Sequence, residues 1–598
     1  MAGGRRLFSP VGGVEREYLL LSPRDADEGS RGPSRAQELA EERIYRAGNE
    51  EGIGYILRPW PGPWKTLRRD GGAWGLEEHS ILEVSTPETA DGIEAVSYLR
   101  ASEASMRLAL AGMEDAPACD AFLTCTPACM TRFEPGNPRQ LWLGFHLNLF
   151  LPLDWRQRRQ LASWLALLSP FISAGGGLTE RGLVLSPAGC RVGDTLGYGM
   201  EARPSLVEVK PSPLFMEERL DPGYFRLHLP CFDAPLSARR LALSFASVQV
   251  VAALVFLREC LPELILANPA RAMAAISSSP LLAEIPASRR FRLEGGRMIT
   301  HAEAMAAALG GLEEARKRFY LDPLRELAVE RLAAGIRAWP RGGEELAEDF
   351  DFFTRAAVHR QALELQGVTP AWFDRVAVPV IALASRMGGG ILELARSSPR
   401  EARSLLRRGG SEHQRERLRS LLRERRLSPQ DIPYLARTVR RLRSLELRLG
   451  EVFPGRSPLA AWDDRTWEDL VRRASSPRRE PNRADARSEL VCRFASLGER
   501  VQATWDHLFF FPPGGGVGVI TLPHPASPKA LPFRWLSEEE QDEYAEARPM
   551  EINYMQFVLR HDREGRREFE ETLAELLRDE SVRSLWGGPP LLNQLRLF

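Results

Sequence analysis

Pairs of polar residues two positions apart recur in apolar segments of this chain that are typical of β-strands. The pairs are Glu15 and Glu17 in GVEREYLL, His146 and Asn148 in GFHLNLF, and Arg226 and His228 in FRLHLP. Because side chains alternate between the two faces of a strand, both members of a pair point to one face. Carboxylates on such a face suit Mg²⁺, and arginine suits phosphate oxygens. The pattern therefore predicts a sheet with one charged face that supports magnesium and phosphate chemistry.

The segment WGLEEHSILEVSTPET, from position 74 to 89, places four glutamates beside Ile, Leu and Val. A buried carboxylate without a partner is costly, so these side chains either face water or have a function. As one continuous strand, the segment would place Glu77, His79 and Glu83 on the same face. Glu208 in SLVEVKP extends the series, and Arg203 is a further candidate for phosphate. A single glutamate in a strand usually faces solvent, so the prediction depends on the whole series.

The elements that must position these residues fall into three regions of the 598-residue chain. Up to about residue 235, short apolar stretches predict strands with helices between them, one helix beginning at Trp155. Helix is expected from Leu236 to about residue 267, and mainly helix again from 269 to about 452. The arginine-rich HQRERLRSLLRERRL is typical of a solvated helix face. A polar hinge over 475–489 precedes a smaller region with strands and a final helix.

The expected fold class is therefore α+β. We expect a larger domain over residues 1–470, which carries the magnesium and phosphate site and has a helical second half. A smaller C-terminal domain and tail over 471–598 would follow the arginine-rich hinge.

The composition and the missing motifs argue against several classes of function. Basic and acidic residues balance at 80 each, which argues against a nucleic-acid partner. The first residues lack an apolar leader, and the apolar stretch Leu241–Leu257 is short for a membrane span, so a buried helix in a cytoplasmic protein is expected. The seven cysteines lack zinc-site spacing. Phosphate-loop, HExxH and GxSxG motifs are absent, and the glycine runs at 175–177 and 514–516 predict turns.

The order of several segments resembles the Pup ligase and Pup deamidase/depupylase family of proteasome accessory factors, within the glutamine-synthetase-like carboxylate–amine ligases. The resemblance runs from Gly13 to Leu531. The matching segments are GVERE, ILEVSTPE, GFHLNLF, SAGGG, VEVK, FRLHLPCFDAP, GGRMI, NRADARS and ATWDHLFFF. The C-terminal match and the STPET sequence are closer to the depupylase branch.

This resemblance implies a curved antiparallel sheet that cradles ATP and Mg²⁺. In such ligases ATP phosphorylates the γ-carboxylate of the C-terminal Glu of Pup, a small disordered protein tag, and a lysine of a target protein then attacks. Depupylases cleave that isopeptide bond or deamidate a C-terminal Gln. Tagged or target proteins, and possibly a proteasome system, are the implied partners. The implied metal ligands are Glu15, Glu17, Glu83, His146 and Glu208. The implied nucleotide-site residues are Arg203, Arg226, His228, Arg297 and His146. The C-terminal motif contains Arg483 and Arg487.

The chain also departs from the family pattern. Glu77 or Glu78, depending on which branch sets the spacing, stands where the family has its catalytic Asp. The family's HEN becomes His-Leu-Asn, and the Asn of GDAN becomes Pro235. A depupylase- or deamidase-like enzyme is slightly favoured over a ligase on the tag. The alternatives are a carboxylate–amine ligase acting on a small molecule and a catalytically diverged protein that binds nucleotide or tag.

Overall fold

The computed structural model describes most of the chain, and the statements below concern the described residues. These are 5–21, 42–47, 52–55, 64–68, 71–77, 81–111, 122–124, 144–172, 174–179, 182–197, 205–210, 225–279, 288–339, 350–387, 391–449, 483–494, 497, 500–503, 507–513, 515–522, 529–547 and 566–585.

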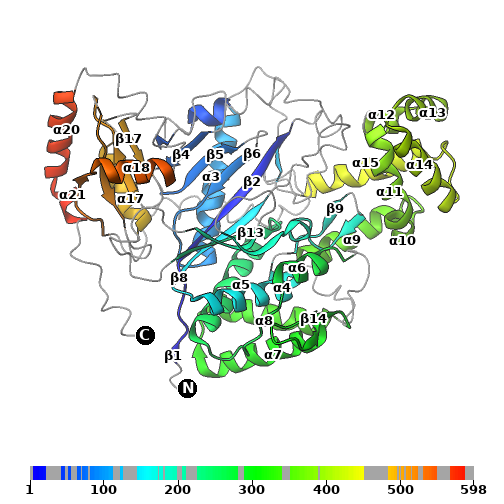
Figure 1. Cartoon of the computed structure of the whole chain (residues 1–598), viewed down its shortest axis with the longest axis horizontal. Coiled ribbons are helices and arrows are strands. Elements are labelled where there is room, and N and C mark those ends of the chain that lie inside the picture. Colours follow the sequence, from blue (N-terminus) through cyan, green and yellow to red (C-terminus); the bar gives the residue numbers. More distant parts are fainter. Residues whose placement is uncertain are drawn as a thin grey trace.

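A ten-stranded sheet forms the centre of the molecule (Figure 1). Neighbouring strands are antiparallel except β11 and β12, which are parallel, and β7 (Phe122–Thr124) pairs with β2 outside the main order. The main order is β11 (Asp194–Gly197), β12 (Ser205–Lys210), β13 (Phe225–Phe232), β8 (Phe145–Leu151), β2 (Gly12–Leu21), β6 (Ile81–Ser85), β5 (Ala73–Glu77), β4 (Trp64–Arg68) and β3 (Gly52–Tyr55).

Four helices pack on one face of this sheet: α3 (Gly92–Ala111), α4 (Trp155–Ile172), α5 (Ala238–Leu257) and α6 (Pro269–Ser277). Helices α7 (His301–Arg318) and α8 (Pro323–Ala338) pack against α4 and α5 on the side away from the sheet (Figure 1). Among the described residues, α5 is the one helix long and apolar enough to cross a membrane, but 89% of its most apolar window is buried in the protein. The predicted buried helix is thus confirmed. Its predicted end near residue 267 is wrong, because Arg258 adopts a left-handed conformation with φ 55° and ends the helix.

The central strand β2 shows how alternation separates the two faces. Arg16 and Tyr18 point toward the helices, where both contact Glu103 of α3, at 3.3 and 2.6 Å. Arg100 completes this buried network by donating to the other oxygen of Glu103 at 2.7 Å. Glu15 and Glu17, which alternate with them along β2, point to the opposite face.

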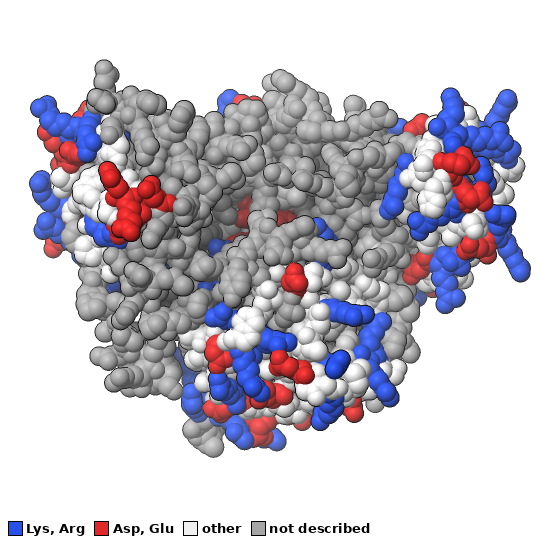
Figure 2. Space-filling model, viewed as in Figure 1, with Lys and Arg blue, Asp and Glu red and all other residues white. Residues whose placement is uncertain are grey.

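The second half of the chain is mainly helical, as predicted. Its helices are α9 (Asp351–Glu364), α10 (Pro370–Trp372), the π-helix η5 (Phe373–Ala377), α11 (Val378–Met387), α12 (Ile391–Arg396), α13 (Pro399–Arg408), α14 (Glu412–Glu424) and α15 (Ile432–Leu449). Helices α11–α15 form a lobe at one end of the molecule, where Figure 2 shows many basic side chains projecting. On α14, Arg415 and Arg419 pair with Glu412 and Glu416 at the surface, which confirms a solvated helix face.

Short strand pairs complete this part of the structure. The strand β1 (Arg5–Arg6) pairs with β16 (Phe319–Tyr320), β9 (Gly177–Thr179) pairs with β10 (Gly182–Val184), and β14 (Arg290–Arg292) pairs with β15 (Met298–Thr300). The 3₁₀-helix η2 spans Gly189–Arg191.

The C-terminal module, residues 483–585, has its own four-stranded sheet at the other end of the molecule (Figure 1). Its elements are α17 (Arg483–Phe494), β17 (Val501–Ala503), β18 (His507–Phe510), β19 (Gly518–Thr521), β20 (Arg534–Trp535), α18 (Glu538–Ala547), α20 (Arg566–Arg578) and α21 (Glu580–Ser584). The expected hinge over 475–489 differs from the structure in its second half. Positions 483–489 are helical there, because two of the arginines that make the segment polar are buried in ion pairs.

Candidate functional site

Four adjacent strands bring the predicted charged residues together on the face of the sheet opposite the described helices. The register places Glu15 of β2 opposite His146 of β8, and Glu17 of β2 opposite Glu83 of β6. On β13, Arg226 and His228 lie on the same face as Glu15. Residues that directly oppose one another in antiparallel strands share a face, so the strand pairing itself assembles this cluster.

Glu15 is the centre of the cluster. Its Oε1 accepts from Arg226 at 2.5 Å, and its Oε2 lies 3.3 Å from His146 Nδ1 and 3.3 Å from His228 Nε2. Arg226 is fixed in turn by Asn148, whose Oδ1 accepts from its Nε at 2.8 Å. Burial raises the pKa of Glu15, but the Arg226 charge and the two histidines outweigh it and hold that pKa well below its usual range. Glu15 is therefore an anion at neutral pH.

Glu17 has a different environment on the same strand. Its carboxylate accepts a hydrogen bond from the backbone N–H of Gly144 and lies 3.5 Å from His146 Nε2. Burial, together with the charges of Glu83 and Glu15, raises the pKa of Glu17, against the opposing effect of His146. A bound cation would relieve this crowding of carboxylates, which is the property expected of a metal-binding group.

His146 lies between the two carboxylates of β2. Burial lowers the pKa of its imidazole, but the hydrogen bond to Glu15 and the charges of Glu17, Glu15 and Glu83 raise it to about 9. Gly144 makes room for this ring, because a Cβ at that position would collide with the His146 ring. Glu83 is also buried, and its Oε1 accepts from Ser85 at 2.8 Å.

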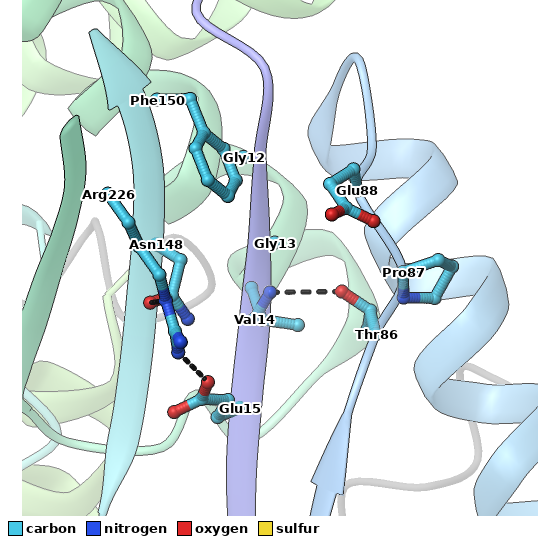
Figure 3. A pocket seen from close by; sticks show the side chains of 10 residues that line it. All are labelled: Gly12, Gly13, Val14, Glu15, Thr86, Pro87, Glu88, Asn148, Phe150 and Arg226. Carbon is cyan, nitrogen blue, oxygen red and sulfur yellow. Dashed lines mark hydrogen bonds and ion pairs between the residues drawn. The ribbon is translucent and has the colours of Figure 1, made fainter. Parts of the chain in front are cut away.

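A pocket opens beside the cluster, at the start of β2 (Figure 3). Figure 3 shows Arg226 and Glu15 joined on one side of β2 and Glu88 on the other. The space between the walls is about 280 Å³ and includes open solvent. A hydrogen bond links β2 to the residue that follows β6, since the backbone N–H of Val14 donates to Thr86 Oγ1 at 3.0 Å. The lining residues are Gly12, Gly13, Val14, Glu15, Thr86, Pro87, Glu88, Asn148, Phe150 and Arg226.

One wall of this pocket is held by the C-terminal module. Glu88 Oε1 accepts from Arg483 Nε at 2.8 Å, and Oε2 accepts from Arg487 Nη2 at 2.8 Å. The guanidinium of Arg483 also lies 4.9 Å from the centre of the Phe150 ring, in cation–π geometry. Burial opposes ionisation of Glu88, but the two arginines hold its pKa at about 2. These three residues, the Glu88 ion cluster, join the module to the site.

Asp233 lies in the matching segment FRLHLPCFDAP, directly after β13, and its role is structural. It is buried and accepts from the backbone N–H groups of Gly175 at 2.8 Å and Ala188 at 2.9 Å. Gly176 has φ +70°, which favours glycine, but Gly177 already begins β9, so the run at 175–177 leads into a strand. Burial raises the pKa of Asp233 to about 6 despite these hydrogen bonds.

The sequence suggested one continuous strand over residues 74–89, and that prediction is wrong. It is a hairpin of β5 and β6, in which Glu77 pairs with Ile81. Glu77 ends β5; its side chain and the whole of Glu78, the two candidates for the catalytic carboxylate, lie outside the described residues. The backbone of Glu208 pairs with His228, which places it beside the cluster, but its side chain is outside the described residues too.

The other two predicted nucleotide-site arginines differ in what the structure says of them. Arg203 lies outside the described residues, so its prediction stays untested. Arg297 is exposed at the tip of the β14–β15 hairpin, where Gly296 turns the chain at φ +85°. Figure 1 places that hairpin beside α7, well away from the sheet face. The small GGR sequence there makes a hairpin turn and does not enter the site.

Two residues of the pocket wall, Phe150 and Glu88, were not predicted from the sequence. Phe150 is two positions after Asn148 and four after His146 on β8, so the period of two could have placed it on their face. The pairing of Glu88 with the two arginines of α17 joins positions 395 and 399 residues apart, and no local pattern could have shown it.

Comparisons with known proteins identify the fold. No protein-family model and none of the curated proteins matches the chain. A solved complex between the prokaryotic ubiquitin-like protein Pup and its ligase PafA aligns with a TM-score of 0.58 at 15% identity, covering 98% of this chain and 99% of that one. The Pup ligase PafA in complex with ADP aligns with a TM-score of 0.51 at 14% identity, covering 83% and 90%. The chain thus has the fold of these ligase structures, and the predicted α+β class is confirmed.

Proposed function

We propose that this chain, which has the fold of the Pup ligase PafA, is an ATP-dependent enzyme of the Pup ligase and depupylase family. It acts on the γ-carboxyl group at the C-terminal Glu or Gln of a small Pup-like protein tag. The observation that carries the proposal is the buried cluster of Glu15, Glu17, Glu83, His146 and Arg226 on the open face of the sheet.

The donor set of this cluster fits Mg²⁺. Three carboxylates lie on neighbouring positions of β2 and β6, and Mg²⁺ takes carboxylate oxygens together with the phosphates of a substrate. Glu15, Glu17 and Glu83, with His146 beside them, would hold it. When bound, Mg²⁺ would neutralise phosphate charge during transfer of the γ-phosphoryl group.

The other side chains of the site have distinct tasks. Arg226 is the guanidinium that lines the pocket and would bind phosphate oxygens, while Asn148 keeps it oriented. Phe150 supplies an aromatic wall. A carboxylate base must then activate the attacking lysine or water, and Glu77 or Glu78 is the proposed group. Because this chemistry depends on positioning, the ion cluster that fixes the Glu88 wall belongs to the same machinery.

Ligation and hydrolysis both take place at the γ-acyl carbon of the tag's C-terminal residue, and the described residues of the site suit either reaction. We favour the depupylase- or deamidase-like direction, on the C-terminal match of the NRADARS segment, whose Arg483 and Arg487 lie against the pocket wall. Tagged proteins are then the substrates and the released tag is a product.

The test is a melting experiment followed by turnover. ATP with Mg²⁺ at millimolar concentration should raise the melting temperature; ligand at one hundred times its Kd contributes about 2.7 kcal/mol. Glu17→Gln should lose most of that rise, whereas the exposed control Glu412→Gln should keep it. A tag ending in Gln should be deamidated, and a tag–lysine conjugate cleaved, by the unmodified chain only. No response to ATP and no tag turnover would refute the proposal.

A further inference from the structure

Two large apolar side chains lie exposed close together where α9 ends and α15 begins. Leu365 is 83% exposed and Tyr434 is 47% exposed, and the Tyr434 hydroxyl donates to the backbone oxygen of Gln366 at 3.4 Å. Arg437 and Arg441 follow Tyr434 by three and seven positions on α15, so the three side chains share one side of the helix. Both arginines are exposed, and neither forms an ion pair with another described residue. These four residues, Leu365, Tyr434, Arg437 and Arg441, are the Tyr434 face.

The helices around this face carry a strong excess of positive charge. From Ile391 to Leu449, which spans α12 to α15, the sequence has 16 arginines and 7 acidic residues. Figure 2 shows the basic side chains projecting from this end of the molecule. A surface of this kind attracts carboxylates, and its exposed aromatic ring adds apolar area for a partner to cover.

A face of the opposite charge lies on the C-terminal module. Trp535, at the end of β20, is 45% exposed, and its ring packs edge to face against Phe533 with centroids 5.1 Å apart. Glu538, Glu539 and Asp542 follow on the first turns of α18; they are exposed, and none forms an ion pair with another described residue. The ten residues of α18 include six acids and no Lys or Arg, and Figure 2 shows acidic side chains gathered over this helix. Trp535 and these three acids are the Trp535 face.

The two faces match in composition and differ in the sign of their charge. Each combines an exposed aromatic ring with charged groups that lack an ion-pair partner among the described residues. Tryptophan, tyrosine and arginine are the side chains that most often dominate the binding energy of protein interfaces. Figure 1 places α15 and α18 at opposite ends of the molecule, so one molecule cannot bring its own two faces together. The formal net charge is zero, so two copies meet without overall repulsion and local charge decides how they bind.

We propose that the Tyr434 face of one copy of this chain binds the Trp535 face of a second copy. The inference goes beyond the proposed function and does not depend on it. The contact is head to tail, because it joins two different surfaces, and each bound copy still offers one free face to the next. Repetition of the contact therefore builds open chains of molecules. Since the charges on both faces are exposed, the contact weakens as salt screens them.

Sedimentation velocity of the full chain, without nucleotide, measures this association. At low salt the sedimentation coefficient should rise steadily with protein concentration, and at about 1 M salt, where screening acts within about 3 Å, it should return to that of a monomer. Two triple variants each remove one face and should stay monomeric alone, because removing even one dominant side chain weakens a contact roughly 30-fold. They are Tyr434→Ala with Arg437→Ala and Arg441→Ala, and Trp535→Ala with Glu539→Ala and Asp542→Ala.

Mixing the two variants gives the sharpest result. Each variant keeps the face that the other has lost, so the mixture should form one-to-one pairs and nothing larger. The pairs also show that both variants are folded, since each must present an intact face. The matched control changes two exposed cations on α7, Lys317→Ala with Arg318→Ala, whose side chains are 74% and 56% exposed. This control should associate like the unmodified chain.

Several outcomes would overturn the inference. They are a monomeric unmodified chain at every concentration in low salt, association that persists at about 1 M salt, and association of either triple variant on its own. If the unmodified chain associates but the mixed variants remain monomers, the contact does not join these two faces. A control that associates more weakly than the unmodified chain would show that general surface charge, and not the two faces, holds the copies together.

Discussion

Neutralising Glu88 should loosen the C-terminal module from the central sheet. The side chains of Glu88 and Arg487 are 3% and 0% exposed, so solvent screens their pairing little. The two arginines hold the pKa of Glu88 at about 2, against an ordinary value of 4.5, and that difference corresponds to about 3 kcal/mol. Breaking a buried pair by removing one partner has a similar cost, because the remaining charge stays buried. Glu88→Gln should therefore destabilise the docking of α17 by about 3 kcal/mol.

Hydrogen exchange of the α17 amides measures this local opening directly. At pH 7 they should exchange roughly 150-fold faster in Glu88→Gln than in the unmodified chain, since about 1.36 kcal/mol corresponds to tenfold. The surface variant Glu412→Gln is the control; its carboxylate is 72% exposed, and such pairs contribute about 0–1 kcal/mol.

The pH dependence gives a second criterion. Because the folded pKa of Glu88 is depressed, its stabilisation is complete above pH 4.5 and is lost as pH falls from there through about 2. The ratio of exchange rates between variant and unmodified chain should thus shrink across that window. A ratio below threefold at pH 7, or one that stays constant down to pH 3, would show that the arginines are not held by this carboxylate.

Three further changes test other parts of the structure. Gly144→Ala places a methyl group against the His146 ring, so it should cost about 1–3 kcal/mol of stability and weaken Mg·ATP binding, as seen by melting with and without nucleotide. Glu103→Gln breaks the buried network behind the sheet and should cost about 3–5 kcal/mol in urea unfolding, yet leave the Kd for ATP unchanged in the folded fraction, because its partners face the helices. Asp233 has a folded pKa raised to about 6, so its charged form is penalised and stability should fall as pH rises from about 4 through 6. Asp233→Asn should remove that slope from the melting temperature; an unchanged slope would mean that another group titrates.

The alternation of side chains along single strands was predictable from the sequence. Period-two spacing is a local property, and it placed Glu15 with Glu17, His146 with Asn148, and Arg226 with His228 correctly on one face. The buried central helix and the solvated arginine face of α14 were also predictable, because both depend on composition within a few turns.

Features that depend on tertiary contacts were not predictable. β5 pairs with β6 as a hairpin, and the residues between Glu77 and Ile81 include neither glycine nor proline, so the sequence lacked the strongest turn signals there. Helix α5 ends at Arg258, a residue type that rarely adopts a left-handed conformation. The helix over 483–489 resembled a hinge because a run of arginines usually faces solvent. Here Arg483 and Arg487 are buried against Glu88, a partner that lies far away in the sequence.

The ion cluster at Glu88 also sets an order for assembly on the ribosome. Its acid is made 395 positions before Arg483, and chains grow at about 5–20 residues per second, so roughly 20 to 80 seconds separate the two partners. During that interval the segments that carry Glu15 and His146 have been synthesised, but Glu88 still lacks Arg483 and Arg487. The pocket is therefore among the last parts of the molecule to be completed. A truncated chain that ends before α17 would display the charged face of the sheet without the arginines that fix the Glu88 wall.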